Sequence, residues 1–276
     1  MTIAEAVPGI PGATMRLVDR LSDTLPGSVP AGPFVQAKPG ALLLLQPGVG
    51  RFLARNGRNI VFAPEAGVDP GVVALILHGT ARGALIHQRG DLPLHAATLV
   101  PPGGDAAVAI CGHSGAGKSS LGAALSRRGW TLVADDTTRV SWDGARAIAW
   151  PSRDTIKLWK DACLSAGIDT APLVRVARSM EKFYVRVPSR DQPVPLDMIV
   201  ELTPEGASSD LSAGDRMALI SRHTYRPGHI RPLGMQLQHV AMVARVASAC
   251  RLRRLPGDKK LSVDSLADAV EAEIRR

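Results

Sequence analysis

Short hydrophobic runs separated by Gly and Pro predict several strands in the first part of the chain. Within residues 41–64, ALLLLQPGVGRFLARNGRNIVFAP, the pair Asn56-Gly57 predicts a hairpin turn between two strands. The pair Asp69-Pro70 predicts the start of a helix, because Asp caps helices and Pro fits the first turn. Gly90 predicts that this helix ends near Gln88.

The pattern divides the chain into two sections. Residues 1–90 are expected to form a lead-in and a small α+β section, and a weak helical pattern runs from Met15 to Leu25. Residues 91–276 begin with LPLHAATLVPPGGDAAVAI, two strands joined by a turn rich in Pro and Gly. Asp143-Gly144 predicts a further hairpin, where a simple doubly wound protein would have a crossover helix. We therefore expect an α/β fold with a mixed sheet.

The end of the chain has a regular pattern. It predicts a helix over residues 233–249, a strand over 251–255 and a final helix over 262–274.

The segment CGHSGAGKSS, residues 111–120, fits the G-x-x-x-x-G-K-[ST] spacing of a phosphate-binding loop. It follows the apolar run Ala106–Ile110 and precedes a helical pattern, which are the flanks that such a loop requires. Backbone N–H groups of the loop and the helix N-terminus would hold phosphate oxygens. We expect a solvent-facing Lys118 to contact the outer phosphates of ATP, and the Ser119 hydroxyl to ligate Mg²⁺. The expected nucleotide-binding positions are Gly112, His113, Ser114, Gly115, Ala116, Gly117, Lys118, Ser119 and Ser120. The alternative is a Gly-rich turn without a ligand, against which the full spacing and the flanks argue.

Two adjacent carboxylates, Asp135 and Asp136, follow a second apolar run, Thr131–Ala134. Carboxylates at the carboxyl end of a strand lie where α/β sheets bind ligands. Neighbouring carboxylates repel each other, so a cation such as Mg²⁺ or Lys118 is expected beside them. One would hold the metal and the other would act as a base, and the sequence leaves open which is which. The alternative is a polar turn after a strand.

Composition limits the classes of molecule that the chain is expected to bind. The chain has 276 residues, of which 45% are hydrophobic and 21% charged, as in a folded globular protein with one large core or two small ones. Its net charge of +8 suits phosphates and acidic peptides, and alone would also permit nucleic acid. Aromatic residues make up only 4%, which argues against base-stacking surfaces and a nucleic-acid partner.

Cysteine spacing and the N-terminal segment indicate the compartment. Cys111, Cys163 and Cys250 lie far apart and predict neither a zinc site nor a disulfide framework, which is typical of a reducing compartment. The first residues lack the continuous apolar segment of a signal peptide, and no run approaches the roughly 18 apolar residues of a membrane span. We expect a cytoplasmic protein without a membrane partner.

Three segments together resemble a known family. LPLHAATLV, GHSGAGKSS and RRGWTLVADD, in this order, resemble the C-terminal catalytic domain of HPr kinase/phosphorylase, whose phosphate-loop core is related to phosphoenolpyruvate carboxykinase. The match is strongest over residues 90–140. QRGDLPLHAATLV with SRDTIKLWKDA looks more like divergent HPr-kinase-like proteins, some of which phosphorylate the C-terminal hydroxyl of lasso-peptide precursors.

The resemblance implies roles for individual residues. Lys118 and Ser119 would bind ATP and Mg²⁺, and Asp135 and Asp136 would serve metal binding and proton transfer. His95 would assist the catalytic aspartate; a hydrogen-bonded core histidine is the alternative. The HPr enzyme is a hexamer, so a homo-oligomer stays open for this chain.

Two departures from the HPr enzyme concern its reverse reaction. Ser120 stands where that enzyme has Glu, and WPSRDTIKLW lacks its E-x-R-G type signature. Both departures argue against the phosphorylase reaction and against HPr itself as substrate.

Four basic residues are expected to contact the phosphate or carboxylate of a substrate, with a solvated surface position as the alternative for each. They are Arg153, Lys157, Lys182 and Arg226, the last in the Arg- and His-rich segment 221–232.

Together these patterns predict an ATP-dependent kinase acting on a serine hydroxyl of a peptide or small protein. Three alternatives remain: an HPr-type protein serine kinase, a small-molecule kinase, and a nucleotide-binding regulatory module without phosphotransfer. The aspartate pair favours an enzyme over a binding module, whereas the peptide acceptor rests on the resemblance alone.

Overall fold

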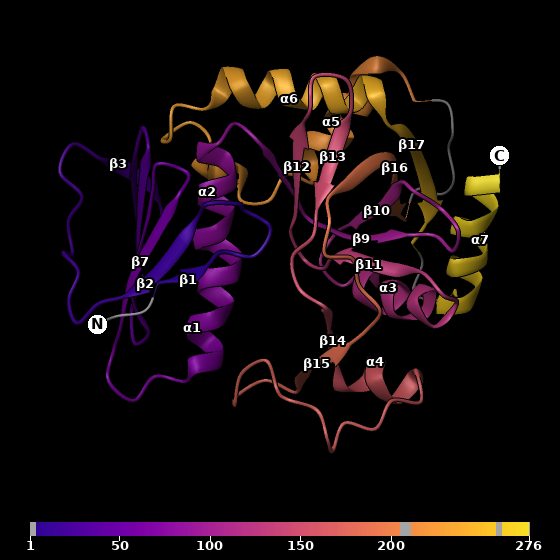
Figure 1. Cartoon of the computed structure of the whole chain (residues 1–276), viewed down its shortest axis with the longest axis horizontal. Helices are drawn as coiled ribbons and strands as arrows, with labels where there is room; N and C mark the ends of the chain where they lie inside the picture. Colours follow the sequence, from indigo (N-terminus) through magenta and orange to yellow (C-terminus); the bar gives the residue numbers. More distant parts are fainter. Residues whose placement is uncertain (1–3, 205–210, 258–260, 276) are drawn as a thin grey trace. The chain divides into compact units, whose positions relative to one another are not determined.

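The structure is a computed structural model that describes residues 4–204, 211–257 and 261–275. It has a mixed α/β fold with several sheets and helices (Figure 1). The chain divides into two compact units, neither of them continuous in sequence. The first comprises Met1–Pro93, Arg175–Glu181 and Tyr225–Met242. The second comprises Leu94–Val174, Lys182–Thr224 and Val243–Arg276.

The first unit contains a seven-stranded sheet with the order β1-β2-β7-β6-β5-β4-β3. Strands β2 and β7 are parallel, and the other neighbours are antiparallel. Between β6 and β7, Asn56 and Gly57 have φ values of 54° and 63°, so the predicted hairpin is confirmed. The strands are β1 (Glu5–Ala6), β2 (Thr14–Leu17), β3 (Val29–Gly32), β4 (Val35–Lys38), β5 (Ala41–Gln46), β6 (Gly50–Arg55) and β7 (Asn59–Pro64).

A continuous helical run follows this sheet, consisting of α1 (Pro70–Ile76), the π-helical turn η1 (Leu77–Ala81) and α2 (Arg82–Gln88). The Asp69 carboxylate caps it by accepting a hydrogen bond from Gly71 N at 2.9 Å. Gly90 follows its end with a φ of 74°, so the predicted start and stop are confirmed. Leu77, Leu85 and other residues of the run pack into a core with Phe52 of the sheet.

The helix expected between Met15 and Leu25 is wrong. Met15 lies in β2 instead, buried and opposite Ile60 in the register with β7. Residues 18–25 contain neither helix nor strand. Pairing with a neighbouring strand therefore overrides a weak local helical pattern.

Gly71 gives a test of packing in the first unit. A Cβ on Gly71 would lie 2.3 Å from Val176 O and 2.9 Å from Ala177 Cα, both of them backbone atoms. We expect Gly71→Ala to lower the free energy of unfolding by about 1–3 kcal/mol through overpacking. The control is Gly214→Ala in the exposed first turn of α5 (Ala213–Arg222), where the nearest atom to a Cβ is Ser212 Oγ at 3.8 Å. Denaturant unfolding followed by circular dichroism should show a loss for the first variant only; equal midpoints would contradict the packing argument.

The second sheet has eight strands, one of which leads into the candidate phosphate-binding loop. Its order is β11-β9-β10-β16-β13-β12-β8, and β17 also pairs with β16. β16 runs parallel to β10 and β17 and antiparallel to β13, so the sheet is mixed, as predicted. The strands are β8 (Leu92–Leu94), β9 (Ala96–Val100), β10 (Ala107–Gly112), β11 (Thr131–Ala134), β12 (Thr138–Trp142), β13 (Ala147–Trp150), β16 (Val194–Thr203) and β17 (Arg251–Pro256).

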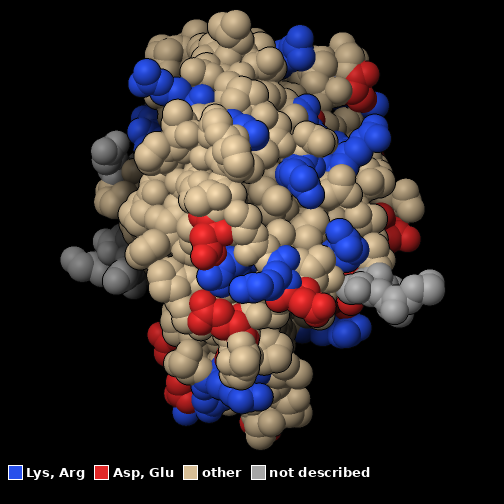
Figure 2. Space-filling model, turned by 90° about the vertical axis from the view of Figure 1, so that its left-hand side faces the viewer, with Lys and Arg blue, Asp and Glu red and all other residues tan. Residues whose placement is uncertain are grey.

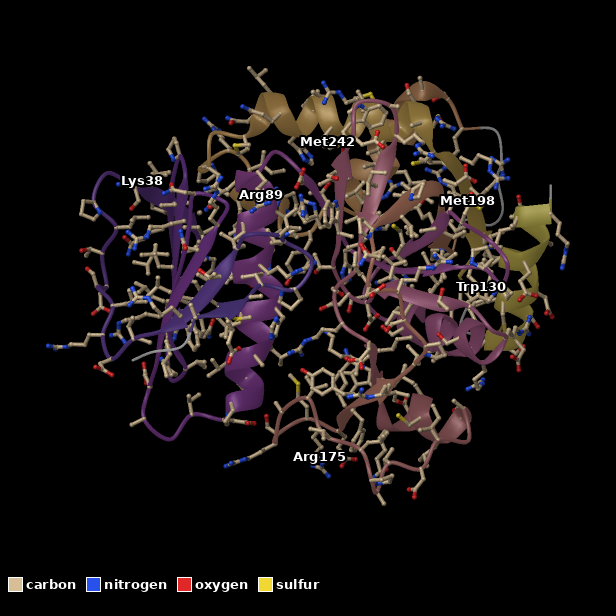
Figure 3. The ribbon with its side chains drawn as sticks, in the orientation of Figure 1. Lys38, Arg89, Trp130, Arg175, Met198 and Met242 are labelled. Atoms are coloured by element: carbon tan, nitrogen blue, oxygen red, sulfur yellow. The ribbon has the colours of Figure 1, made fainter. Side chains whose placement is uncertain are left out.

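A hydrophobic core joins one face of this sheet to α3 (Lys118–Arg127), α7 (Val263–Arg275) and a two-stranded ribbon of β14 (Thr155–Trp159) and β15 (Lys182–Arg186). Leu121 of α3 and Val270 of α7 belong to this core, as do Trp130 and Met198, which are labelled in Figure 3. The remaining helices are α4 (Lys160–Ser165), the 3-10 turn η2 (Pro227–His229) and α6 (Gln236–Ala249).

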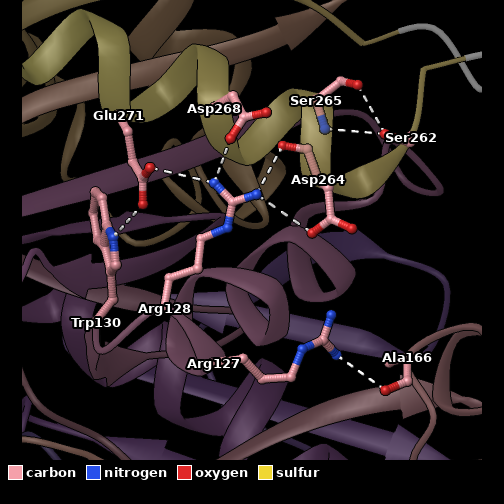
Figure 4. A network of polar contacts seen from close by, with 9 residues as sticks. All are labelled: Arg127, Arg128, Trp130, Ala166, Ser262, Asp264, Ser265, Asp268 and Glu271. Carbon is pink, nitrogen blue, oxygen red and sulfur yellow. Dashed lines mark hydrogen bonds and ion pairs between the residues drawn. The ribbon is translucent and has the colours of Figure 1, made fainter.

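Polar contacts hold α7 against the end of α3 (Figure 4). Arg128 donates to the carboxylates of Asp268 at 2.6 Å and Glu271 at 3.3 Å, and to the backbone oxygen of Asp264 at 3.2 Å. Trp130 Nε1 also donates to Glu271 at 3.3 Å. These contacts fix the helix that follows the candidate phosphate loop.

Two surface properties bear on partners. No helix within the described ranges is long and apolar enough to cross a membrane. On the face drawn in Figure 2, Lys and Arg side chains are spread among Asp and Glu side chains and do not gather into a single stripe.

Candidate active site

The loop between β10 and α3 has the conformation that its glycines allow. Gly115 and Gly117 have φ values of 83° and 85°, and a Cβ on either would meet nothing within 4 Å. Backbone conformation, not packing, therefore requires glycine here, and the space beside both residues is open. Gly117 is the N-cap of α3, and no side chain caps the helix. Uncapped amides at a helix N-terminus suit a bound anion, so the loop fits the phosphates of a nucleotide.

Lys118 is buried, contrary to the solvent-facing position expected from the sequence. The residue is only 9% exposed, and its ammonium donates to Gly112 O at 2.9 Å and His113 O at 3.1 Å. The burial lowers the pKa of Lys118, although Cys111 and the two aspartates oppose this shift. The loop therefore folds around its own lysine and holds the ammonium beneath its carbonyl groups.

The Asp135 carboxylate faces the loop. Ser119 Oγ donates to Asp135 Oδ1 at 3.0 Å, and Lys157 N donates to Asp135 Oδ2 at 3.0 Å. Burial raises the pKa of Asp135, against the opposing positive charge of Lys157. A hydroxyl and a carboxylate are oxygen ligands of the kind that Mg²⁺ prefers, and one or two carboxylates suffice when phosphates complete the shell. Ser119 and Asp135 therefore fit a Mg²⁺ ion bound together with a nucleotide.

The Asp136 carboxylate has a different set of partners. Its φ of 72° lies in the left-handed region, which turns the chain sharply after β11. Lys157 Nζ donates to Asp136 Oδ2 at 2.6 Å, and His95 Nδ1 lies 3.6 Å from Asp136 Oδ1. Burial raises the pKa of Asp136, but the Lys157 ammonium outweighs burial and holds it below the ordinary value. Lys157 is thus a cation in direct contact with the pair, in addition to Lys118, on whose pKa the charges of both aspartates also act.

His95 lies at the break between β8 and β9. Its Nδ1 is 2.7 Å from Asp136 O, and its backbone N donates to His223 O at 2.8 Å. Burial lowers the pKa of His95, with Lys118 acting in the same direction and Asp136 opposing. A carbonyl oxygen only accepts, so the neutral ring carries its proton on Nδ1 and has Nε2 as an acceptor. His95 therefore orients the backbone of Asp136 without itself being charged at neutral pH.

The sequence did not predict a role for one buried carboxylate, which is linked to His95 through His223. Glu201 of β16 is 4% exposed and accepts from His223 Nε2 at 2.7 Å and Arg254 Nε at 2.9 Å. Burial would raise the pKa of Glu201, but these two hydrogen bonds and the positive charges lower it to about 2. The one available signal was a Glu within the otherwise apolar segment MIVELT. Because His223 O accepts from His95 N, the Glu201–His223 pair anchors the backbone that holds His95.

The basic residues expected at the substrate have different positions. Lys157 contacts both aspartates, as described above. Arg153 lies over the Tyr184 ring at 5.8 Å, and Lys182 over the Trp159 ring at 5.2 Å, all in the second unit. Arg226 belongs to the first unit, where its guanidinium lies 5.6 Å from the Tyr225 ring. The second unit by itself therefore brings three of the four basic residues to the ribbon or to the segment leading into it.

The remaining loop residues complete the description of the expected nucleotide site. His113, Ser114 and Gly115 are exposed, whereas Ala116 is buried. His113 Nδ1 lies 2.9 Å from Ser114 O, and Ala116 N donates to His113 O at 3.1 Å. The tip of the loop is thus open to solvent and its base is anchored in the core.

Comparisons with known proteins find a distant similarity among the solved structures. No protein-family model and no curated protein matches the chain. Among solved structures, the chain is similar to the HPr(Ser) kinase/phosphatase from Coxiella burnetii, with a TM-score of 0.37 and 15% sequence identity. The match covers 66% of this chain and 90% of that chain.

Proposed function

We propose that the chain is an ATP-dependent kinase that transfers the γ-phosphoryl group of ATP to a serine hydroxyl of a peptide or small protein. The observation that carries this proposal is that the two adjacent carboxylates have different partners. Asp135 accepts from Ser119 of the loop, while Asp136 points to Lys157 and His95. A phosphotransferase needs one group that holds the metal near the phosphates and another that receives the proton of the acceptor.

The nucleotide would be held by the loop. Amides at the start of α3 and the Lys118 ammonium would bind the phosphates, and Ser119 with Asp135 would hold Mg²⁺. When bound, Mg²⁺ would neutralise charge that develops on the phosphate oxygens. The open space beside Gly115 and Gly117 supports close approach of the phosphates to the backbone.

Asp136 would act as the base. The acceptor hydroxyl would lose its proton to Asp136 as its oxygen bonds to the γ-phosphorus, while the bond from that phosphorus to the β–γ bridging oxygen breaks and ADP leaves. Lys157 lowers the pKa of Asp136 against the effect of burial, so the carboxylate is ionised at neutral pH and can accept a proton. Lys157 and His95 would keep it oriented toward the acceptor.

The peptide acceptor draws its support from the resemblance to HPr-kinase-like proteins that modify lasso-peptide precursors. In this version of the proposal, the acceptor is the C-terminal serine of such a precursor. A basic ribbon beside the aspartates suits an acceptor that carries a terminal carboxylate.

Mass spectrometry tests the proposed function. The chain is incubated with Mg·ATP and, separately, with a lasso-type precursor ending in Ser, with HPr and with free serine. We expect one added phosphate on the terminal serine of the precursor and none on the other two. Phosphate on HPr or free serine alone would replace the peptide reading with one of the alternatives. If all three stay unmodified while the chain binds ATP, the regulatory-module alternative takes its place.

A further inference from the structure

The ribbon of β14 and β15 has one apolar and one polar face. Ile156, Leu158, Phe183 and Val185 are buried in the core of the second unit. Residues directly opposite each other in antiparallel strands share a face. Opposite pairs on the other face are Thr155 with Arg186, Lys157 with Tyr184 and Trp159 with Lys182. This face therefore contacts the aspartate pair through Lys157 and continues along the ribbon to Lys182.

Lys182 differs from Lys157 in its partners. The Lys157 ammonium is engaged by Asp136 at 2.6 Å. The Lys182 ammonium lies 5.2 Å from the centroid of the Trp159 ring, and within the described ranges it makes neither a hydrogen bond nor an ion pair. An indole face attracts a cation without using its N–H donors. Trp159 thus holds the Lys182 side chain in place and leaves its donors available to a ligand.

The charges around the aspartates are unbalanced. Asp135 and Asp136 carry two negative charges, and both of them act on Lys118, Lys157 and Lys182. Burial lowers the pKa of Lys182, and the positive charge of Lys157 adds to this effect, while the two aspartates oppose it. One positive charge of this group therefore has no carboxylate to match it.

We propose that Lys182 binds an oxyanion that a reactant brings to the site, next to Asp136. A phosphoryl group and a carboxylate present the same chemistry to an ammonium, namely a negatively charged oxygen that accepts its N–H donors. The two sources are the γ-phosphoryl group of ATP and a carboxylate of the acceptor. The inference rests on the proposed function for the identity of these reactants.

Two measurements on Lys182→Ala separate the sources. Calorimetry gives the affinity for a non-hydrolysable Mg·ATP analogue and for Mg·ADP. If the ammonium binds the γ-phosphoryl group, the analogue loses about tenfold or more in affinity, whereas ADP binding is unchanged. If it binds the acceptor, nucleotide affinities are unchanged, and KM for the precursor with a free C-terminus rises about tenfold or more, toward that of the C-terminal amide.

Two further variants serve as controls. Lys182→Arg keeps the positive charge. It should therefore recover much of the nucleotide affinity, or return the KM for the precursor most of the way to the parental value, whichever of the two Lys182→Ala changes. Lys160→Ala removes a neighbouring exposed lysine of α4 and should change neither quantity. Unchanged binding and unchanged KM in Lys182→Ala, or equal effects in Lys160→Ala, would overturn the inference.

The outcomes also separate this inference from the proposed function. If the parent chain phosphorylates the precursor and Lys182→Ala behaves in the same way, the proposed kinase function stands and the proposed role of Lys182 is wrong. If the parent chain binds the ATP analogue through Lys182 but phosphorylates no acceptor, the oxyanion site stands and the proposed kinase function is wrong. A parent chain that binds no nucleotide and modifies no acceptor removes both.

Discussion

Lys118→Ala should lower ATP turnover by at least about a hundredfold, because it removes the ammonium that would neutralise the outer phosphates. Stability should change little, within about 1 kcal/mol, because two opposing effects accompany the substitution. The variant loses the hydrogen bonds to Gly112 O and His113 O, which is destabilising. It also removes a buried ammonium, which is stabilising because burial disfavours the charged form of Lys118 and lowers its pKa. Turnover is measured by release of ADP, and stability by thermal unfolding.

Arg127→Ala is the matched control, because Arg127 is an exposed cation in the last turn of the same helix. Its guanidinium donates to Ala166 O at 3.3 Å. Turnover in this variant should equal that of the parent. If Lys118→Ala also turns over ATP at the parental rate at matched thermal stability, the loop has no part in the mechanism.

The two aspartates should give different kinetic defects when each is changed to Asn. Asp135→Asn removes a charge from the expected Mg²⁺ ligands, so half-maximal activity should need a higher Mg²⁺ concentration. Asp136→Asn removes the base, so kcat at saturating Mg²⁺ should fall by about 10²–10⁴-fold. Initial rates over a Mg²⁺ titration, with circular dichroism to check folding, measure both.

Asp143→Asn supplies the comparison, since Asp143 lies in the turn between β12 and β13 and its carboxylate accepts from Ala145 N at 2.9 Å. This variant should keep both the parental kcat and the parental Mg²⁺ dependence. Parental activity in Asp135→Asn and Asp136→Asn would show that the pair is only a turn. A swap of the two defects would reverse their roles.

Local rules accounted for much of the fold. Asn56-Gly57 turns the chain because both residues tolerate positive φ, and Asp69 caps a helix because its carboxylate reaches an amide two residues on. By contrast, the first compact unit includes Arg175–Glu181 and Tyr225–Met242, far along the sequence. Such joining depends on long-range packing, which the spacing of hydrophobic residues does not encode.

The candidate site shows the same division. The loop spacing and the aspartate pair could be predicted because each is a short motif. Which carboxylate faces the loop depends on the positive φ of Asp136 and on the Lys157 ammonium, which reaches the pair from β14. Burial of Lys118 likewise follows from how the loop closes over it, and no residue pattern near position 118 indicates this.

A crystal structure of the chain with Mg²⁺ and a non-hydrolysable ATP analogue tests the central claim most directly. We predict phosphates on the backbone amides between Gly115 and Ser119, with Lys118 in contact with them. The metal should be bound by Ser119 Oγ and Asp135, and the Asp136 carboxylate should be free of metal and face the γ-phosphorus. A nucleotide bound elsewhere, or a metal held by Asp136 with Asp135 turned away, would contradict the account.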